Sequence, residues 1–140
     1  MKDRNKLIKH KWESKKKRLK YHLKQKNINN VPRLIVFRSN KNIFTQLVDD
    51  ENSNTILSVS SIDIKLKGAI EKAKSKIEKS KIVGNTIAEK MKKANIDKII
   101  FDRNGYKYHG RIKAVGNAIR SSEIQILRGY ICVRLLIQQN

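Results

Sequence analysis

From residue 33 onward, short apolar runs alternate with short polar stretches. The runs 33–39, 43–49 and 55–60 are rich in β-branched and aromatic residues, and polar, turn-forming residues separate them. This pattern predicts three strands, and the short connections predict an antiparallel meander. Pro32 fits the beginning of the first strand, where proline is tolerated.

A helical period follows the three strands. Val83, Ile87, Met91 and Ala94 recur at the spacing that places them on one face of a helix, and Lys and Glu lie on the opposite side. The pattern predicts a helix from about residue 75 to a stop near residue 95. It leaves open whether the helix begins earlier, near residue 70.

Three shorter elements complete the predicted domain. Residues 98–101 form a buried strand, which the preceding helix would place parallel to another strand. A second helix follows residue 110 with Ile112, Val115 and Ile119 on one face, and residues 123–126 predict a last strand. The expected fold is therefore α+β, a mixed sheet that contains the three-strand antiparallel meander and is covered by two packed helices.

The charge of the chain indicates the class of its partner. Thirty-three Lys and Arg stand against 12 Asp and Glu among 140 residues, a formal net charge of +21. Self-repulsion of this size does not stabilise a free protein, but a polyanion would neutralise it. Nucleic acid is the first candidate, because Lys and Arg that contact phosphates release condensed counterions. An anionic membrane surface is the alternative.

More than half of this excess charge lies at the beginning of the chain. The first 33 residues hold 13 Lys or Arg and two acidic residues, a net of +11. Ile8, Trp12, Leu19 and Leu23 fall on roughly one helical face, which two lysines interrupt. The segment is expected to be either a disordered basic tail or a segment that becomes helical against RNA. A membrane-bound or calmodulin-binding helix is less favoured, because the apolar face is broken.

Several other classes of protein and site do not fit the sequence. With one cysteine, Cys132, the chain cannot form an intrachain disulfide, and its His and Cys lack the spacing of zinc ligands. No apolar run approaches the ~20 residues needed to span a bilayer. The basic first residues do not resemble a secretory signal. We therefore expect no metal, no cofactor, no membrane association and no small-molecule substrate.

Two polar segments lie at the ends of predicted strands. In the first, Arg38 and Lys41 can neutralise phosphates, while Ser39 and Asn40 can hydrogen-bond a phosphate, a 2′-OH group or a base edge. Taken alone, this segment is more typical of an ordinary hairpin turn. The sequence of residues 38–41 therefore permits an RNA contact without requiring one.

The second polar segment, residues 102–111, gives a stronger signal. Its aromatic side chains, Tyr106, Tyr108 and His109, offer flat faces for unpaired bases. The cations Arg103, Lys107 and Arg111 can hold the RNA backbone, and Gly105 and Gly110 allow unusual backbone angles and a close approach to a ligand. The alternative is a structural loop whose tyrosines cover the core. The density of donors and aromatic rings favours RNA binding.

An enzyme is the least favoured interpretation of the same loop. Asp102 and His109 could act as an acid–base pair, for example in a nuclease. The predicted domain holds no second histidine and no carboxylate cluster for Mg²⁺. Asp102 would more simply cap the loop or pair with an arginine. We therefore expect no catalytic residues.

Three motifs in this order resemble the bacterial type of large-subunit ribosomal protein eighteen. They are Pro32-Arg-Leu-Ile-Val-Phe-Arg-Ser-Asn-Lys41, Gln46-Leu-Val-Asp-Asp50 and Phe101-Asp-Arg-Asn-Gly-Tyr-Lys-Tyr-His-Gly-Arg111. The resemblance extends from the basic beginning of the chain to about residue 126. It implies a cytoplasmic ribosomal protein, with an organellar ribosome as the alternative.

The resemblance also implies partners and contact residues. A member of this family would bind 5S rRNA and help to attach it to the large-subunit rRNA in the central protuberance, beside ribosomal protein five of the large subunit. The implied domains are a basic RNA-binding tail (1–31), a globular 5S rRNA-binding domain (32–126) and an extension of unknown role (127–140). The expected RNA contacts are Arg4, Lys15, Lys16, Lys17, Arg18, Lys20, Arg33, Arg38, Ser39, Asn40, Lys41, Arg103, Tyr106, Lys107, Tyr108, His109, Gly110 and Arg111.

The sequence also departs from the family pattern. Asn104 stands where a glycine is common, although asparagine also tolerates left-handed backbone angles. Residues 63–79 differ most, and this region is expected to form a longer loop or a helix. The last residues, 127–140, continue past the usual end of the family.

Overall fold

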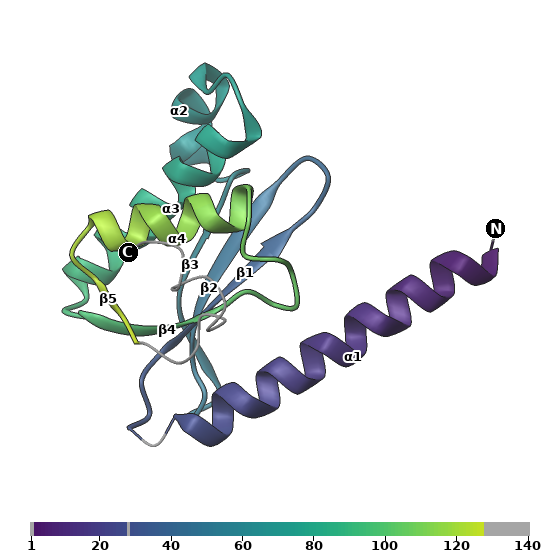
Figure 1. The fold of residues 1–140 in the computed structure, drawn as a ribbon. Coiled ribbons are helices and arrows are strands. Elements are labelled where there is room, and N and C mark those ends of the chain that lie inside the picture. Colours follow the sequence, from purple (N-terminus) through teal and green to yellow (C-terminus); the bar gives the residue numbers. More distant parts are fainter. Residues whose placement is uncertain (1, 28, 128–140) are drawn as a thin grey trace, which may run out of the picture.

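The fold consists of a mixed sheet and four α-helices in a computed structural model that describes residues 2–27 and 29–127 (Figure 1). In chain order the elements are α1 (Lys2–Lys26), β1 (Arg33–Arg38), β2 (Ile43–Asp49), β3 (Asn54–Ser60), the 3₁₀ helix η1 (Ile64–Leu66), α2 (Lys67–Lys72), α3 (Lys76–Lys93), β4 (Lys98–Asp102), α4 (Arg111–Ser121) and β5 (Gln125–Ile126). The predicted α+β class is confirmed. Residues 128–140, most of the expected extension, lie outside the described residues.

The sheet has the strand order β3-β2-β1-β4-β5. The three meander strands pair antiparallel, as predicted, and β4 pairs parallel to both β1 and β5. Leu34 in β1 stands opposite Leu47 in β2 and Phe101 in β4. Because β1 and β4 run in the same direction, their carboxyl ends lie at the same edge of the sheet.

Helices α3 and α4 cover one face of this sheet, which confirms the two predicted packed helices. Alternate side chains of β1, Leu34 and Val36, are fully buried in the core beneath these helices, together with Val83 of α3. A Cβ on Gly84 would lie only 2.8 Å from the Cβ of Ala118, so a glycine at this position lets the two helix backbones approach closely.

The beginning of α3 explains why its period does not continue to residue 70. The Ser75 hydroxyl accepts a hydrogen bond from the Glu78 amide, and the Glu78 carboxylate accepts one from the Lys74 amide. This pair resembles a capping box, except that the Glu78 carboxylate reaches the residue before the N-cap Ser75, and it marks the beginning of the helix. The preceding segment forms the separate helix α2, where Ile70 is buried. The region that departs most from the family is thus helical over part of its length.

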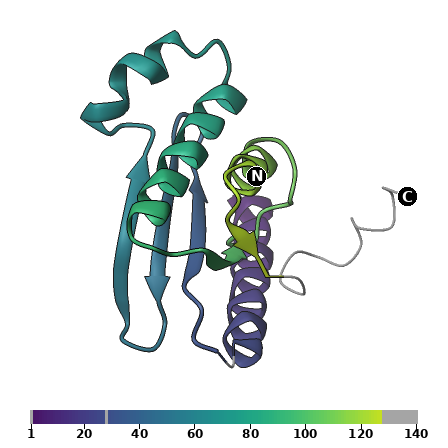
Figure 2. The same ribbon diagram turned by 90° about the vertical axis from the view of Figure 1, so that its left-hand side faces the viewer.

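The basic N-terminal segment forms a long helix instead of an extended tail. Helix α1 lies on the side of the sheet opposite α3 (Figure 2), and its N-terminal half extends away from the domain (Figure 1). Leu23 is buried and Leu19 is half-buried, as the apolar stripe predicts, whereas Ile8 is 57% exposed because it lies on the projecting half. Among the described residues, no helix is long and apolar enough to cross a membrane.

Candidate nucleic-acid interface

The two polar segments that the sequence indicated meet at one edge of the sheet. Residues 39–42 follow β1, and residues 103–110 follow its parallel neighbour β4. The Tyr106 hydroxyl donates a hydrogen bond to the Arg38 carbonyl oxygen at 3.1 Å, and Arg111 Nη1 donates one to the Ser39 carbonyl oxygen at 2.8 Å. The hairpin tip and the loop therefore form one surface.

Two arginines are held close together on this surface. The Arg38 guanidinium lies over the Tyr106 ring, 4.9 Å from the ring centre. Burial and the nearby Arg38 charge lower the pKa of Arg111. Two cations at such a short separation repel each other, and a phosphate that bound both would relieve that repulsion.

Three residues of the loop before Arg111 have positive φ angles, which asparagine and glycine tolerate better than other residues. Asn104 has φ +52°, Gly105 φ +81° and Gly110 φ +57°. The expected freedom of the two glycines and of Asn104 is confirmed. The backbone amide of Asn104 donates a hydrogen bond to a carboxylate oxygen of Asp102, which fixes the beginning of the loop.

Helix α1 packs against the same loop through Trp12. The Trp12 and Tyr106 ring centres are 5.6 Å apart, and a Cβ on Gly105 would lie 3.2 Å from Trp12 Nε1. The Lys16 ammonium lies over both the Trp12 ring and the Phe37 ring, at 5.3 and 5.7 Å from their centres. The lysine that interrupts the apolar stripe thus packs against aromatic rings while it keeps its charge. Trp12 was not predicted to be part of this site. Its place as an aromatic residue within a basic run is the feature of the sequence that could have indicated it.

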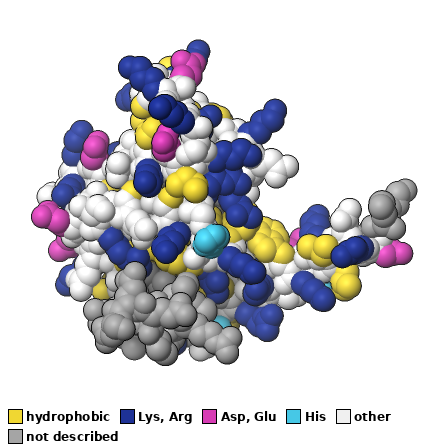
Figure 3. All heavy atoms as spheres, turned by 45° about the horizontal axis from the view of Figure 1, so that its top comes forward, with side chains coloured by type: hydrophobic (Ala, Val, Ile, Leu, Met, Phe, Trp, Pro, Cys, Tyr) yellow, Lys and Arg dark blue, Asp and Glu magenta, His cyan; other side chains and the backbone are white. Residues whose placement is uncertain are grey.

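Most of the expected contact residues are accessible. Figure 3 shows Lys and Arg side chains gathered where α1 meets the domain. Those that are exposed are Arg4, Lys15, Lys17, Arg18, Lys20, Arg38, Ser39, Asn40, Lys41, Lys107 and His109. Those that are half-buried are Lys16, Arg103, Tyr106, Tyr108, Gly110 and Arg111.

Tyr108 is bound more closely to the core than its neighbours in the loop. Its ring meets Phe101 edge to face with centres 5.8 Å apart, and a Cβ on Gly116 would collide with its hydroxyl. Burial raises the pKa of Tyr108, although the Arg120 charge partly offsets that rise. For this tyrosine the alternative interpretation, a side chain that covers the core, fits the contacts better than base stacking.

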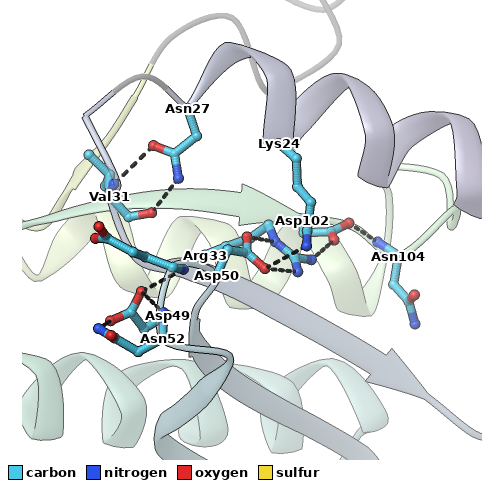
Figure 4. A network of polar contacts seen from close by, with 10 residues as sticks. Lys24, Asn27, Val31, Arg33, Asp49, Asp50, Asn52, Asp102 and Asn104 are labelled. Carbon is cyan, nitrogen blue, oxygen red and sulfur yellow. Dashed lines mark hydrogen bonds and ion pairs between the residues drawn. The ribbon is translucent and has the colours of Figure 1, made fainter.

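Arg33 is buried and forms ion pairs with carboxylates inside the protein (Figure 4). It is 3% exposed, with Nη1 2.6 Å from an Asp102 oxygen and with Nε and Nη2 each 2.7 Å from an Asp50 oxygen. Burial opposes its charge, but the hydrogen bond to Asp50 and the two carboxylate charges outweigh that effect and raise the pKa of Arg33. Its donors are engaged inside the protein, so they are not free to meet a phosphate.

The same network leaves Asp102 unsuited to acid–base chemistry. One Asp102 oxygen accepts from Arg33 and the other accepts from the Asn104 amide, while the side chain is buried. The expectation that Asp102 caps the loop or pairs with an arginine is confirmed. Within residues 2–27 and 29–127, no group of three His, Cys, Asp or Glu is placed to hold a metal ion.

Comparison with known proteins identifies the family. Residues 6–126 match the family described as ribosomal L18 of archaea, bacteria, mitochondria and chloroplast. The large ribosomal subunit protein uL18 of Fusobacterium nucleatum is 54% identical over 91 residues, which is 65% of this chain and 74% of that protein. Its counterpart in Herpetosiphon aurantiacus is 45% identical over 94 residues, 67% of this chain and 77% of the relative. The uL18 of Methylobacterium radiotolerans is 46% identical over 97 residues, 69% of this chain and 80% of the relative.

The residues that match the family cover the candidate site. The matched residues include both polar loops, the whole sheet and most of α1. Proteins of this family are structural constituents of the large ribosomal subunit and are not enzymes. The chain belongs to the ribosomal L18 family, as a uL18 protein of the bacterial type.

Proposed function

We propose that this protein binds 5S rRNA and helps to attach it to the large-subunit rRNA in the central protuberance, beside ribosomal protein five of the large subunit. The family places the chain in the large ribosomal subunit, and the bacterial relatives make it a cytoplasmic ribosomal protein. The convergence of α1, the hairpin tip and the loop 103–110 on one edge of the sheet supports an extended RNA surface.

The surface divides into two parts with different physical tasks. Helix α1 carries twelve Lys or Arg and two acidic residues, so it supplies attraction that depends on salt but little on RNA sequence. The two loops add the exposed polar side chains of Ser39 and Asn40 and the exposed ring of His109. Such groups recognise 2′-OH groups and unpaired bases.

The observation that carries the proposal is the arrangement of Arg38 and Arg111. The Arg38 guanidinium lies over the Tyr106 ring, and Arg111 is hydrogen-bonded to the hairpin backbone, so both guanidinium groups are oriented before RNA arrives. Pre-oriented groups lose less conformational freedom on binding, which improves both affinity and specificity. A surface of mobile lysines would have neither advantage.

The deciding experiment is competition between RNAs of equal length. The full-length protein is mixed with labelled 5S rRNA, and either unlabelled 5S rRNA or an unrelated structured RNA is added at fixed salt. The proposal expects 5S rRNA to compete far better. Equal competition would identify the protein as a general RNA binder and would contradict the proposal.

A further inference from the structure

An open pocket beside α1 is not accounted for by the contacts described above. It has a volume of about 450 Å³. The residues that line it are His10, Lys11, Trp12, Ser14, Lys15, Arg18 and Gly105. All except Gly105 belong to α1, and no carboxylate is among them.

The cations of this pocket lie along one side of the helix. Lys11, Lys15 and Arg18 are spaced i, i+4 and i+7, so their side chains are neighbours, and all three are exposed. Like charges at this spacing repel each other and destabilise the helix. An anion between them would reverse the sign of that contribution, so the stripe favours a phosphate.

The rest of the pocket is suited to a flat apolar group. Trp12 contributes an aromatic ring that Tyr106 and the loop hold in place. Gly105 has no side chain, so Trp12 packs closely against the loop and its ring is fixed in the wall of the pocket. Pockets that bind small ligands have volumes of roughly 300–1,000 Å³, and this one falls within that range.

We propose that this pocket takes one unpaired nucleotide of the bound rRNA, with its base against Trp12 and its flanking phosphates on Lys11, Lys15 and Arg18. The inference rests on the proposed function, because it assigns a nucleotide subsite to the same RNA surface. An unpaired nucleotide fits better than duplex backbone, because duplex backbone would use the cations and leave the part of the Trp12 ring that lines the pocket uncovered.

Trp12 is the only tryptophan of the chain, so the tryptophan fluorescence of the protein reports on the surroundings of this one side chain. The full-length protein is titrated with 5S rRNA while binding is followed separately by the anisotropy of labelled RNA. Stacking of a base on Trp12 is expected to quench its emission with the same midpoint as binding. Binding of 5S rRNA without a change in emission would overturn the inference and leave the proposed function intact. If 5S rRNA does not bind in preference to other RNA, the proposed function itself fails.

A short single-stranded oligoadenylate and the same oligonucleotide with its bases removed separate base from phosphate. The intact oligonucleotide is expected to quench Trp12, whereas the abasic one is not. Equal quenching by both would mean that the pocket takes phosphates only, and it would overturn the assignment of a base.

Two exposed lysines provide a matched pair of variants. Lys15 lines the pocket, whereas Lys93 lies in the last turn of α3, outside the candidate RNA surface. Lys15→Ala is expected to weaken quenching by the oligoadenylate several-fold, and Lys93→Ala to leave it nearly unchanged. Trp12→Ala should reduce oligoadenylate affinity about tenfold, the usual effect of losing a stacking partner. Trp12→Phe, which keeps a ring against Tyr106, should recover part of that loss. Equal effects of the two lysine variants would contradict the pocket.

Discussion

The Tyr106 hydroxyl donates a hydrogen bond to the Arg38 carbonyl oxygen, 68 positions earlier in the chain, at 3.1 Å. The same tyrosine carries the Arg38 guanidinium on its ring and meets Trp12 of α1. Tyr106 therefore joins all three segments of the candidate RNA surface. Its ring is already occupied by protein groups, so its main role is to position Arg38.

Tyr106→Phe tests this positioning role, because it removes the hydrogen bond and keeps the ring. We expect a loss of at most about 1 kcal/mol in the free energy of unfolding, the usual net value of one such bond. Affinity for 5S rRNA should fall as well, because the hairpin tip is held less firmly. Tyr21→Phe is the control, since Tyr21 is exposed on α1 and bonded only within that helix. Equal effects of the two variants on affinity would contradict the role of Tyr106.

Arg33 and Arg38 lie at the two ends of β1. We expect Arg33 to control the stability of the fold and Arg38 to control the affinity for RNA. Arg33→Ala would leave Asp102 buried without its partner, and breaking a buried ion pair in this way costs about 3–5 kcal/mol. Arg38→Ala should change stability little and lower RNA affinity, because Arg38 is exposed. Urea unfolding and RNA binding measured on both variants check this division. An unfolding free energy unchanged by Arg33→Ala would show that the ion network does not stabilise the fold.

Acid should weaken the fold through Asp50. The hydrogen bond from Arg33 lowers the pKa of Asp50, although burial opposes that shift. A carboxylate with a lowered pKa contributes stability above its unfolded-state pKa of about 3.9, and it loses that stability as pH falls through the folded-state pKa. The free energy of unfolding, measured in urea from pH 6 down to 3, should therefore fall less steeply in Asp50→Asn than in the unaltered protein. Parallel curves would exclude this contribution.

Alanine substitutions at Gly105 and Gly110, compared with each other, distinguish the effect of backbone strain from the effect of α1 packing. Both have positive φ, so alanine at either position is strained and should cost about 1–2 kcal/mol. Only at Gly105 would the added Cβ meet Trp12 Nε1 and the Lys16 Cβ, at 3.2 and 3.4 Å; at Gly110 nothing lies within 4 Å. We expect Gly105→Ala, and not Gly110→Ala, to shift the emission of Trp12 in the free protein. A shift in neither variant would mean that α1 does not depend on this contact.

The electrostatic role of α1 predicts a local effect on salt dependence. Replacing four of its exposed lysines with Gln (Lys11, Lys15, Lys17 and Lys20) should flatten the plot of log affinity against log salt by roughly 0.7–0.9 for each phosphate that the helix no longer neutralises. The control makes the same change at the opposite edge of the sheet, at the end of α3 and the beginning of β4 (Lys90, Lys92, Lys93 and Lys98). The control slope should stay close to that of the unaltered protein. Equal slopes for the two variants would mean that RNA affinity depends only on the total charge of the protein and not on where that charge lies.

The sequence predicted those parts of the fold that depend on local pattern. The strand alternation around Leu34 and Val36, and the helical period of Val83 and Ile87, are local signals with one structural solution each. The helix α1 was less clear, because Lys16 looked like a break in the apolar stripe. Only the folded chain brings Phe37 to a distance at which the Lys16 ammonium packs over it.

The candidate site was predicted in part, for the same reason. Residues 38–41 and 103–111 were identified from composition, and their meeting follows from the parallel pairing of β1 and β4. Arg33 was expected to contact RNA because the family resemblance implied it. Its partner Asp102 is 69 positions away, so the ion pair exists only after long-range strand pairing. Tyr108 likewise became a core contact once α4 brought Gly116 beneath it.

Hydrogen exchange of the backbone amides, with and without 5S rRNA, tests most directly whether α1 and the two loops form one RNA surface. We predict that bound 5S rRNA slows exchange together in three segments, namely the exposed part of α1 and residues 38–41 and 103–111. Exchange in residues 94–97, which precede β4 at the opposite edge of the sheet, should stay unchanged. Equal protection of residues 94–97, or protection of α1 without either loop, would contradict a single RNA surface at this edge.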